Sequence, residues 1–138
     1  MNGNDLVALL LRSPFNFLLG NTMLLTVTGR VTGRKYTTPV GYYRTGKELW
    51  VITSRDRTWW RNLKDGARVE MRIRGKVVSG FAIAELDEKA VADRLGEFLT
   101  QVPMAAGPLG VRVENGKPHP EDAARAAGDR LFVKIQMD

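Results

Sequence analysis

The residues best suited to bind an anion lie in a glycine-punctuated segment, Thr28-Gly29-Arg30-Val31-Thr32-Gly33-Arg34-Lys35. Glycines allow a backbone to approach a ligand closely, while clustered cations and threonine hydroxyls suit the oxygens of phosphates and carboxylates. The segment matches neither the dinucleotide-binding GxGxxG pattern nor the phosphate-binding P-loop. A solvated basic turn would have the same composition, so the segment by itself indicates an anion site only weakly.

A second candidate segment, 54–63, reads Ser-Arg-Asp-Arg-Thr-Trp-Trp-Arg-Asn-Leu and joins a predicted strand to a predicted short helix. Backbone N–H groups are free at the start of a helix and can receive an anion. Ser54 adds a hydroxyl and Arg55 a guanidinium beside that point. Trp59 shares a face with the leucine four residues later and is expected to pack inward, which places Trp60 nearer a groove wall. Core packing is the competing interpretation for both tryptophans.

Two tyrosines, Tyr42 and Tyr43, lie on the strand expected between these segments. Side chains alternate across a strand, so at most one of the two can line a given pocket. Tyr42 and Ser54 are the candidates for supplying a proton or stabilising an oxyanion. Structural packing of both tyrosines is the alternative.

The composition narrows the chemistry, because the chain has no cysteine and one histidine. Without cysteine there are no disulfides, thiolate catalysis or iron–sulfur clusters, and a reducing cytoplasm is the expected compartment. His119 lies between Pro118 and Pro120 and is predicted to be a solvated loop residue. Histidine-based triads and metal sites are therefore not expected, and a bound cofactor is expected to supply any demanding chemistry.

Positive charge is concentrated in the first part of the chain. Residues 1–80 contain 14 Lys and Arg against five Asp and Glu, whereas residues 81–138 contain seven against ten. A positive field of this kind attracts nucleic acid, anionic lipid or a phosphate-bearing cofactor.

The most apolar stretch is Leu6–Leu25, but Arg12 and Pro14 interrupt the run of about 20 apolar residues that a membrane span needs. Two short helices are predicted within residues 1–21, the second beginning at Ser13-Pro14. Their leucines are expected to cover one end of the core, with peripheral membrane contact through residues 6–20 as the alternative.

The chain predicts one domain over residues 1–138, since a domain usually has about 100–200 residues. After the helical segment 1–21, barrel strands are expected in 22–86, a helix in 87–102, and a loop, a short helix and a last strand in 103–138. Closely spaced antiparallel strands predict a mainly β fold with flanking helices (α+β), closed into a small barrel. The expected strands are Met23–Thr28, Tyr36–Tyr43, Glu48–Thr53, Ala67–Arg74, Val77–Glu85 and Arg130–Met137, with a further short one at Gly110–Val113.

Three helices are expected after the first strands. Asp87 is placed to cap the longest, which runs to Val102 with one apolar stripe. The two shorter ones are predicted at Trp59–Lys64, capped by Asp56 or Thr58 and ended by Gly66, and at Pro120–Ala127, closed by Gly128.

Taken together, the stretch Leu24–Leu63 resembles the deazaflavin-dependent nitroreductase family, the coenzyme F-420-using branch of the split β-barrel flavoproteins. The family pattern is LLTTTGR, then (K/R)SGxxR, TPL, a strand with tyrosines, Ser-Lys or Ser-Arg, and W(Y/H)xNL. The corresponding pieces follow in the same order here, as Leu24-Leu25-Thr26-Val27-Thr28-Gly29-Arg30, Thr32-Gly33-Arg34, Thr38-Pro39-Val40, Tyr42-Tyr43, Ser54-Arg55 and Trp59-Trp60-Arg61-Asn62-Leu63.

The resemblance implies a split β-barrel in which the deazaflavin ring of coenzyme F-420 lies against strands, while its phosphate and polyglutamyl tail follow basic residues. The implied activity is hydride transfer from the reduced coenzyme to a small acceptor such as a quinone or a nitroaromatic. Carried over by position, the implied cofactor contacts are Arg30, Thr32, Pro39, Thr53, Ser54, Arg55, Trp59 and Asn62, with Arg34 and Lys35 beside them.

This sequence departs from the family pattern at several positions. Val31 and Tyr36 stand where the family usually has basic residues, and Arg34 and Lys35 are expected to substitute for them. The tyrosine-rich C-terminal stretch that shapes the substrate pocket in relatives is replaced by Met104–Pro108. The substrate is therefore left open.

Other interpretations remain open. One keeps the fold and replaces the cofactor by FMN or heme, and another is a carrier of lipids or small molecules without catalysis. Binding of single-stranded nucleic acid by a basic barrel is less favoured, because no RNA- or DNA-binding signature is present. A homodimer is expected, since split barrels of this size often pair to complete a pocket.

Overall fold

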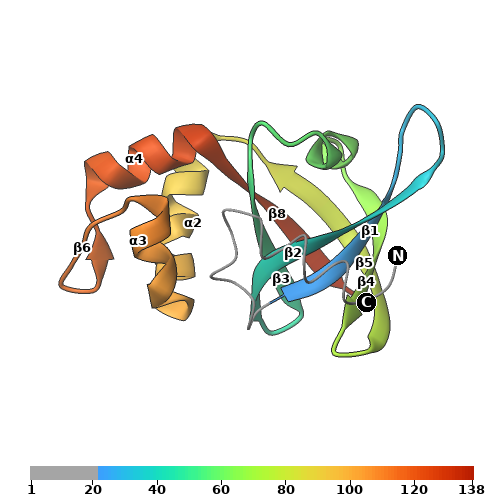
Figure 1. Ribbon diagram of the computed structural model, residues 1–138, viewed down its shortest axis with the longest axis horizontal. Helices are drawn as coiled ribbons and strands as arrows, with labels where there is room; N and C mark the ends of the chain where they lie inside the picture. The colour runs from blue at the N-terminus through green and yellow to red at the C-terminus, as the bar shows by residue number, and fades with distance from the viewer. Residues whose placement is uncertain (1–21) are drawn as a thin grey trace.

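Six antiparallel strands, paired in the order β1-β2-β3-β8-β5-β4, close into a barrel in the computed structural model, which describes residues 22–138 (Figure 1). Closure pairs β1 with β4, so each barrel strand has a hydrogen-bonded neighbour on both sides. The predicted mainly β class with flanking helices is confirmed. The strands are β1 (Thr22–Thr28), β2 (Lys35–Thr45), β3 (Glu48–Ser54), β4 (Ala67–Ile73), β5 (Lys76–Glu85) and β8 (Arg130–Met137).

The barrel interior is filled because apolar and polar side chains alternate along the strands. In β4, Val69 and Met71 are buried, whereas Arg68, Glu70 and Arg72 are exposed. The other strands contribute buried side chains to the same interior cluster, among them Met23, Leu25, Val27, Val40, Leu49, Val51, Leu131, Val133 and Ile135.

A second apolar core lies between the barrel and the helices α2 (Glu88–Gln101) and α4 (Pro120–Asp129), which lie on one side of the barrel (Figure 1). Phe98 of α2 and Phe132 of β8 meet there edge to face, with ring centroids 5.8 Å apart. Trp50 of β3 packs against Phe132 in the same core. The helical layer therefore covers the outer faces of β3 and β8.

The two ends of the barrel are built differently. At one end, the turn 29–34, the end of β3 and the 3-10 helix η2 (Trp59–Leu63) meet, and this end is called the η2 rim. At the other end lie the β2–β3 turn at Gly46-Lys47, the β4–β5 turn at Arg74-Gly75 and the end of β8, and this end is called the hairpin rim. In Figure 1 the η2 rim is at the top and the two hairpins point downward.

The predicted barrel strands agree with the observed ones to within two residues, and Arg130–Met137 is reproduced as β8. The predicted cap of α2 is confirmed, since the Asp87 carboxylate accepts the N–H of Ala90 at 3.0 Å. The short helix predicted from Trp59 is present as η2, but Thr58 precedes it without a side-chain capping hydrogen bond. Gly66 follows it with a φ of 86°, the left-handed conformation expected of a terminating glycine.

The connection from α2 to α4 differs from the prediction. The strand predicted at Gly110–Val113 is wrong, because Gly110 adopts a φ of 68° and ends a short helix instead of extending. A separate two-stranded hairpin then follows. The observed elements are η3 (Pro103–Ala105), α3 (Ala106–Leu109), β6 (Val113–Glu114) and β7 (Lys117–Pro118).

Two expectations around α4 are also corrected. Gly128 does not close the helix, which continues to Asp129 and ends where Arg130 adopts the extended conformation that starts β8. His119 lies in a connecting segment as predicted, but it is half-buried and not fully solvated, at the N-cap position of α4. Its Nδ1 lies 3.3 Å from the guanidinium of Arg112.

The two short helices predicted in residues 1–21, and the membrane contact through residues 6–20, lie outside the described residues. Between residues 22 and 138, every helix is too short or too polar to cross a membrane.

Candidate functional site

The turn 29–34 is held in a closed shape by its own backbone. The N–H of Gly29 donates to the carbonyl of Arg34 at 2.8 Å, and the N–H of Gly33 donates to the carbonyl of Gly29 at 3.0 Å. Gly33 has a φ of 72°, which favours glycine at this position. Thr32 Oγ1 accepts the N–H of Arg34 at 3.2 Å, so this hydroxyl supports the turn.

Asn62 joins this turn to η2. Its Oδ1 accepts the backbone N–H of Arg30 at 3.0 Å, and its Nδ2 donates to the carbonyl of Trp59 at 3.1 Å. Both ends of the carboxamide are thus engaged by backbone groups. The Arg30 guanidinium lies 3.3 Å from the exposed carboxylate of Asp65, which adds a second contact between the turn and the residues after η2. Asn62 therefore positions the turn, a role different from the direct cofactor contact expected from the resemblance.

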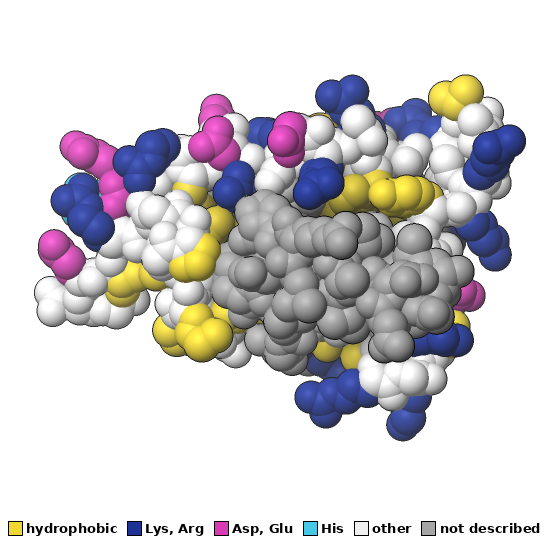
Figure 2. Space-filling view, in the orientation of Figure 1, with side chains coloured by type: hydrophobic (Ala, Val, Ile, Leu, Met, Phe, Trp, Pro, Cys, Tyr) yellow, Lys and Arg dark blue, Asp and Glu magenta, His cyan; other side chains and the backbone are white. Residues whose placement is uncertain are grey.

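Exposed cations surround this rim. In Figure 2, dark blue side chains gather over the turn between β1 and β2. Among residues 22–138, no carboxylate pairs with Arg34 or Lys35, and both side chains are exposed. The exposed cations of the turn and of the segment around η2 are Arg30, Arg34, Lys35, Arg57, Arg61 and Lys64.

The end of β3 places Thr53 and Ser54 on opposite faces of the sheet. Both are buried, with 4% and 8% of their surface exposed. Thr53 is on the same face of β3 as Leu49 and Val51, which face the barrel interior. Ser54 is on the opposite face, which the helices cover. A single pocket therefore cannot be lined by both side chains within the strand.

Arg55 hydrogen-bonds backbone carbonyls of distant elements, a role that the sequence did not predict. Its Nε donates to the carbonyl of Ala127 at 3.1 Å, and its Nη2 donates to the carbonyls of Ala127 and Leu86, each at 2.9 Å. The backbone N–H of Arg55 donates to Asp129 at 3.0 Å. The guanidinium thus ties the end of β3 to the end of α4 and to the residue after β5.

The two tyrosines separate as predicted from strand alternation. Half-buried Tyr42 packs against the barrel interior, and Tyr43 is buried in the core beneath the helices. The Tyr43 hydroxyl accepts a hydrogen bond from Arg94 at 3.3 Å, and burial raises the pKa of Tyr43 to about 12. Tyr42 lies opposite Val51 on the inward face, whereas Ser54 is on the other face, so the two proton-donor candidates do not converge.

The prediction for Trp59 is confirmed and that for Trp60 is wrong. Both side chains are buried, each 8% exposed, and both belong to the barrel-interior cluster together with Leu63. A short 3-10 helix placed over a barrel end has apolar neighbours on more than one side, which a one-face helical pattern does not anticipate. The Nε1–H of Trp60 is buried, and no acceptor for it is found among the described residues 22–138.

Pro39 lies within β2, opposite Leu24 of β1 and half-buried. Pairing of β2 with β3 begins two residues later, at Gly41. Proline has no N–H to donate, which agrees with the start of the β3 pairing after this residue.

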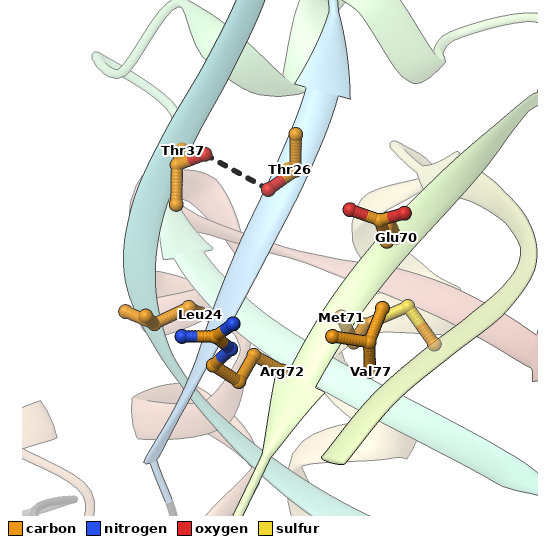
Figure 3. A pocket seen from close by; sticks show the side chains of 7 residues that line it. All are labelled: Leu24, Thr26, Thr37, Glu70, Met71, Arg72 and Val77. Carbon is orange, nitrogen blue, oxygen red and sulfur yellow. Dashed lines mark hydrogen bonds between the residues drawn. The ribbon is translucent and has the colours of Figure 1, made fainter. Parts of the chain in front are cut away.

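A groove of about 480 Å³ runs along the outer face of β1 and β4 (Figure 3). The hydroxyls of Thr26 and Thr37 lie 2.8 Å apart on one of its walls. A smaller hollow of about 170 Å³ shares Thr26 and Glu70 with this groove and is also lined by Lys35. Lys35, a predicted site residue, lines the smaller hollow and directly follows the turn of the η2 rim.

Comparison with known proteins identifies the family. Residues 14–105, about two thirds of the chain, match the model of the family described as F420H(2)-dependent quinone reductase. The chain belongs to this family. The matched range includes the turn, the end of β3 and η2, and the resemblance stated above is confirmed. None of the curated proteins matches the chain.

Two solved structures with the same fold are described as flavin-binding proteins. The general stress FMN/FAD binding protein of Xanthomonas citri is 17% identical with a TM-score of 0.54, over 88% of this chain and 79% of its own. A FAD-binding protein of Mesorhizobium loti is 12% identical with a TM-score of 0.53, over 100% of this chain and 91% of its own.

A third match, Atu2129 of unknown function from Agrobacterium tumefaciens, is 15% identical with a TM-score of 0.59 over 85% of this chain. This chain spans 48% of the length of that protein. At these identities the matches establish the fold, and the predicted split β-barrel is confirmed.

The quinone reductase family is a family of deazaflavin-dependent oxidoreductases, and coenzyme F-420 is the cofactor in its name. The η2 rim fits an anionic, planar group of this kind on two observations. Arg34 and Lys35 offer cations without a carboxylate partner among residues 22–138. Trp60 offers a buried indole N–H without an acceptor, which costs about 1–3 kcal/mol unless a ligand satisfies it.

Proposed function

We propose that this protein binds reduced coenzyme F-420 at the η2 rim and transfers its hydride to a small acceptor, such as a quinone or a nitroaromatic. The observation that carries the proposal is the turn 29–34, held to η2 by Asn62. Arg34 and Lys35 project from this rim, and no carboxylate of the described residues 22–138 pairs with them. Family membership supports the same cofactor.

Charge-assisted contacts would hold the phosphate and the polyglutamyl tail. Each hydrogen bond to a charged group contributes about 1.5–3 kcal/mol, so the exposed cations of the turn supply a large part of the binding energy. Lys35 also borders the hollow that continues into the outer groove, where Arg72 offers another cation. The tail would therefore run from the turn along the outer face of β1.

The bound coenzyme supplies a hydride, which is two electrons and one proton, and a quinone needs one further proton to become a hydroquinone. Tyr42 is the better placed of the two candidate donors, because its half-buried side chain faces the barrel interior with Trp59 and Trp60. Ser54 faces the other side of the sheet and would have to act from the helical layer. The remaining task of the site is to position the ring and exclude water.

The test is a titration of the protein with oxidised coenzyme F-420, followed by the change in its fluorescence. The double variant Arg34→Ala/Lys35→Ala is expected to bind at least ten-fold more weakly, because two charged contacts are removed. The control Lys89→Ala/Lys117→Ala removes the same charge from exposed positions on the helical side and is expected to bind as wild type does.

Equal affinity in the wild type and in the Arg34/Lys35 variant would contradict this site. A parallel titration with FMN separates the proposal from the alternative cofactor, which the descriptions of the structural neighbours favour. Oxidation of F420H2 in the presence of a soluble naphthoquinone then tests the reaction. Tyr42→Phe is expected to slow that turnover while leaving the affinity for the oxidised coenzyme within about two-fold, because a proton donor is not a tail contact.

A further inference from the structure

The barrel mouth at the hairpin rim has an apolar floor. Ile73, Val78 and Met137 face the interior there, and each is only half-buried. At the opposite end, Trp59, Trp60 and Leu63 of η2 are buried and fill the interior. A pocket of about 510 Å³ lies over the three half-buried side chains.

Four cations line this pocket. Arg44 and Lys47 come from the β2–β3 hairpin, and Arg74 and Lys76 from the β4–β5 hairpin. Dark blue side chains gather along this lower edge of the molecule in Figure 2. All four residues are exposed.

The pocket has little negative charge of its own. Among the described residues, its one acidic lining residue is Asp138, whose carboxylate is paired with Arg68 outside the pocket. Within residues 22–138, no carboxylate is paired with Lys47, Arg74 or Lys76. Like charges around one opening repel one another, so an anion in the pocket would be stabilised by all four.

Arg74 has a backbone conformation that a long side chain rarely adopts. Arg74 has a φ of 51° and Gly75 a φ of 82° in the two-residue β4–β5 turn. Such turns favour asparagine or glycine at the first position, and a long side chain there is unfavourable. Unfavourable conformations of this kind gather at sites where the side chain has a function.

We propose that the hairpin-rim mouth binds an amphiphilic anion, a molecule with an apolar tail and a carboxylate or phosphate head. The tail lies against Ile73, Val78 and Met137, and the head lies among the cations of the two hairpins. This site is at the opposite end of the barrel from the η2 rim, so it does not depend on the proposed coenzyme site. A merely solvated basic surface would lack the apolar floor.

The probe is decanoate, used below its micelle concentration and titrated by isothermal calorimetry. Inorganic phosphate tests the head without a tail, and decyl glucoside tests the tail without a charge. Decanoate is expected to bind at least ten-fold more tightly than either. Equal affinity for decyl glucoside would overturn the proposal.

The variant Arg74→Gly/Lys76→Ser removes two cations and is expected to fold, because glycine adopts a positive φ readily. Its affinity for decanoate should fall at least ten-fold, while Lys89→Ala/Lys117→Ala, with the same net charge, should bind as wild type does. An unchanged affinity in the first variant would overturn the proposal. Binding to phosphatidylglycerol vesicles shows whether the anionic head group belongs to a membrane lipid. If the wild type binds the vesicles and Arg74→Gly/Lys76→Ser binds them more weakly, the ligand is a membrane lipid. If the wild type binds decanoate but not the vesicles, the ligand is a free amphiphile.

Discussion

At the scale of the residue, the η2 rim depends on side chains that hold the backbone. Asn62 links the turn 29–34 to η2, and Arg55 links the end of β3 to α4 and to the residue after β5. Both occupy positions that the family resemblance assigns to direct cofactor contact. In this structure Asn62 holds the turn that carries the exposed cations, and Arg55 holds the end of β3 against its neighbours.

Tyr43 is expected to make stability depend on alkaline pH. Burial raises its pKa from 10.0 to about 12, so the unfolded chain releases this proton first and stability falls as the pH rises from 10 to 12. A shift of this size corresponds to about 2–3 kcal/mol. Urea unfolding of wild type and Tyr43→Phe at pH 8 and pH 11.5 measures it.

The loss between the two pH values should be smaller in Tyr43→Phe, because phenylalanine has no proton to release. All other ionisable groups are the same in the two proteins, so their contributions cancel in the difference. Identical losses in both proteins would show that Tyr43 does not contribute.

At the scale of the element, the junction of η2 and β4 is fixed by a glycine. Gly66 has a φ of 86°, and an added Cβ there would overlap the ring of Phe81 on β5. A second contact between elements uses Asp122 of α4, whose carboxylate accepts the backbone N–H and the Nε of Arg112 at 2.9 and 2.8 Å. Arg112 holds the pKa of Asp122 far below its ordinary value.

Gly66→Ala is expected to lower the free energy of unfolding by about 1–3 kcal/mol. The left-handed conformation accounts for about 1–2 kcal/mol of that loss, and displacement of the partly exposed Phe81 ring adds the rest. Gly46→Ala is the matched control, since Gly46 has a φ of 61° but open space around it. Urea unfolding should show a larger decrease in the free energy of unfolding for Gly66→Ala than for Gly46→Ala. Equal decreases would show that the Phe81 contact does not contribute.

At the scale of the whole molecule, one side of the barrel is covered by helices, while β5 presents an apolar stripe outward. Val77, Phe81 and Ile83 are 55%, 45% and 42% exposed on the same face of that strand. Contiguous exposed apolar patches often mark surfaces that meet a partner. We propose this stripe as the contact surface of the expected homodimer.

We expect a dimer in solution that Ile83→Glu converts to a monomer, because two buried carboxylates would face each other across a symmetric interface. Sedimentation velocity over a range of protein concentrations measures the change. Met104→Glu, at a residue that is 70% exposed on the helical side, serves as the control. A wild-type protein that is monomeric at all concentrations would contradict the expectation.

The sequence by itself determined the strands, the cap at Asp87 and the split of Tyr42 and Tyr43, because alternation and capping are set by residues a few positions apart. The basic turn and the motif after β3 also sufficed to recognise the family. The failed strand at Gly110–Val113 was a local ambiguity, where a glycine could either extend or end a short helix.

Only the tertiary structure decided what those residues contact. Arg55 donates a hydrogen bond to the carbonyl of Ala127, which is 72 positions away in the chain. Asn62 accepts one from the backbone of Arg30, which is 32 positions away. Closing the barrel brings such segments together, and it also buries Trp60 and gathers the cations of two separate hairpins around one apolar mouth. These distances are fixed by the packing of the whole barrel, and no pattern of neighbouring residues encodes them.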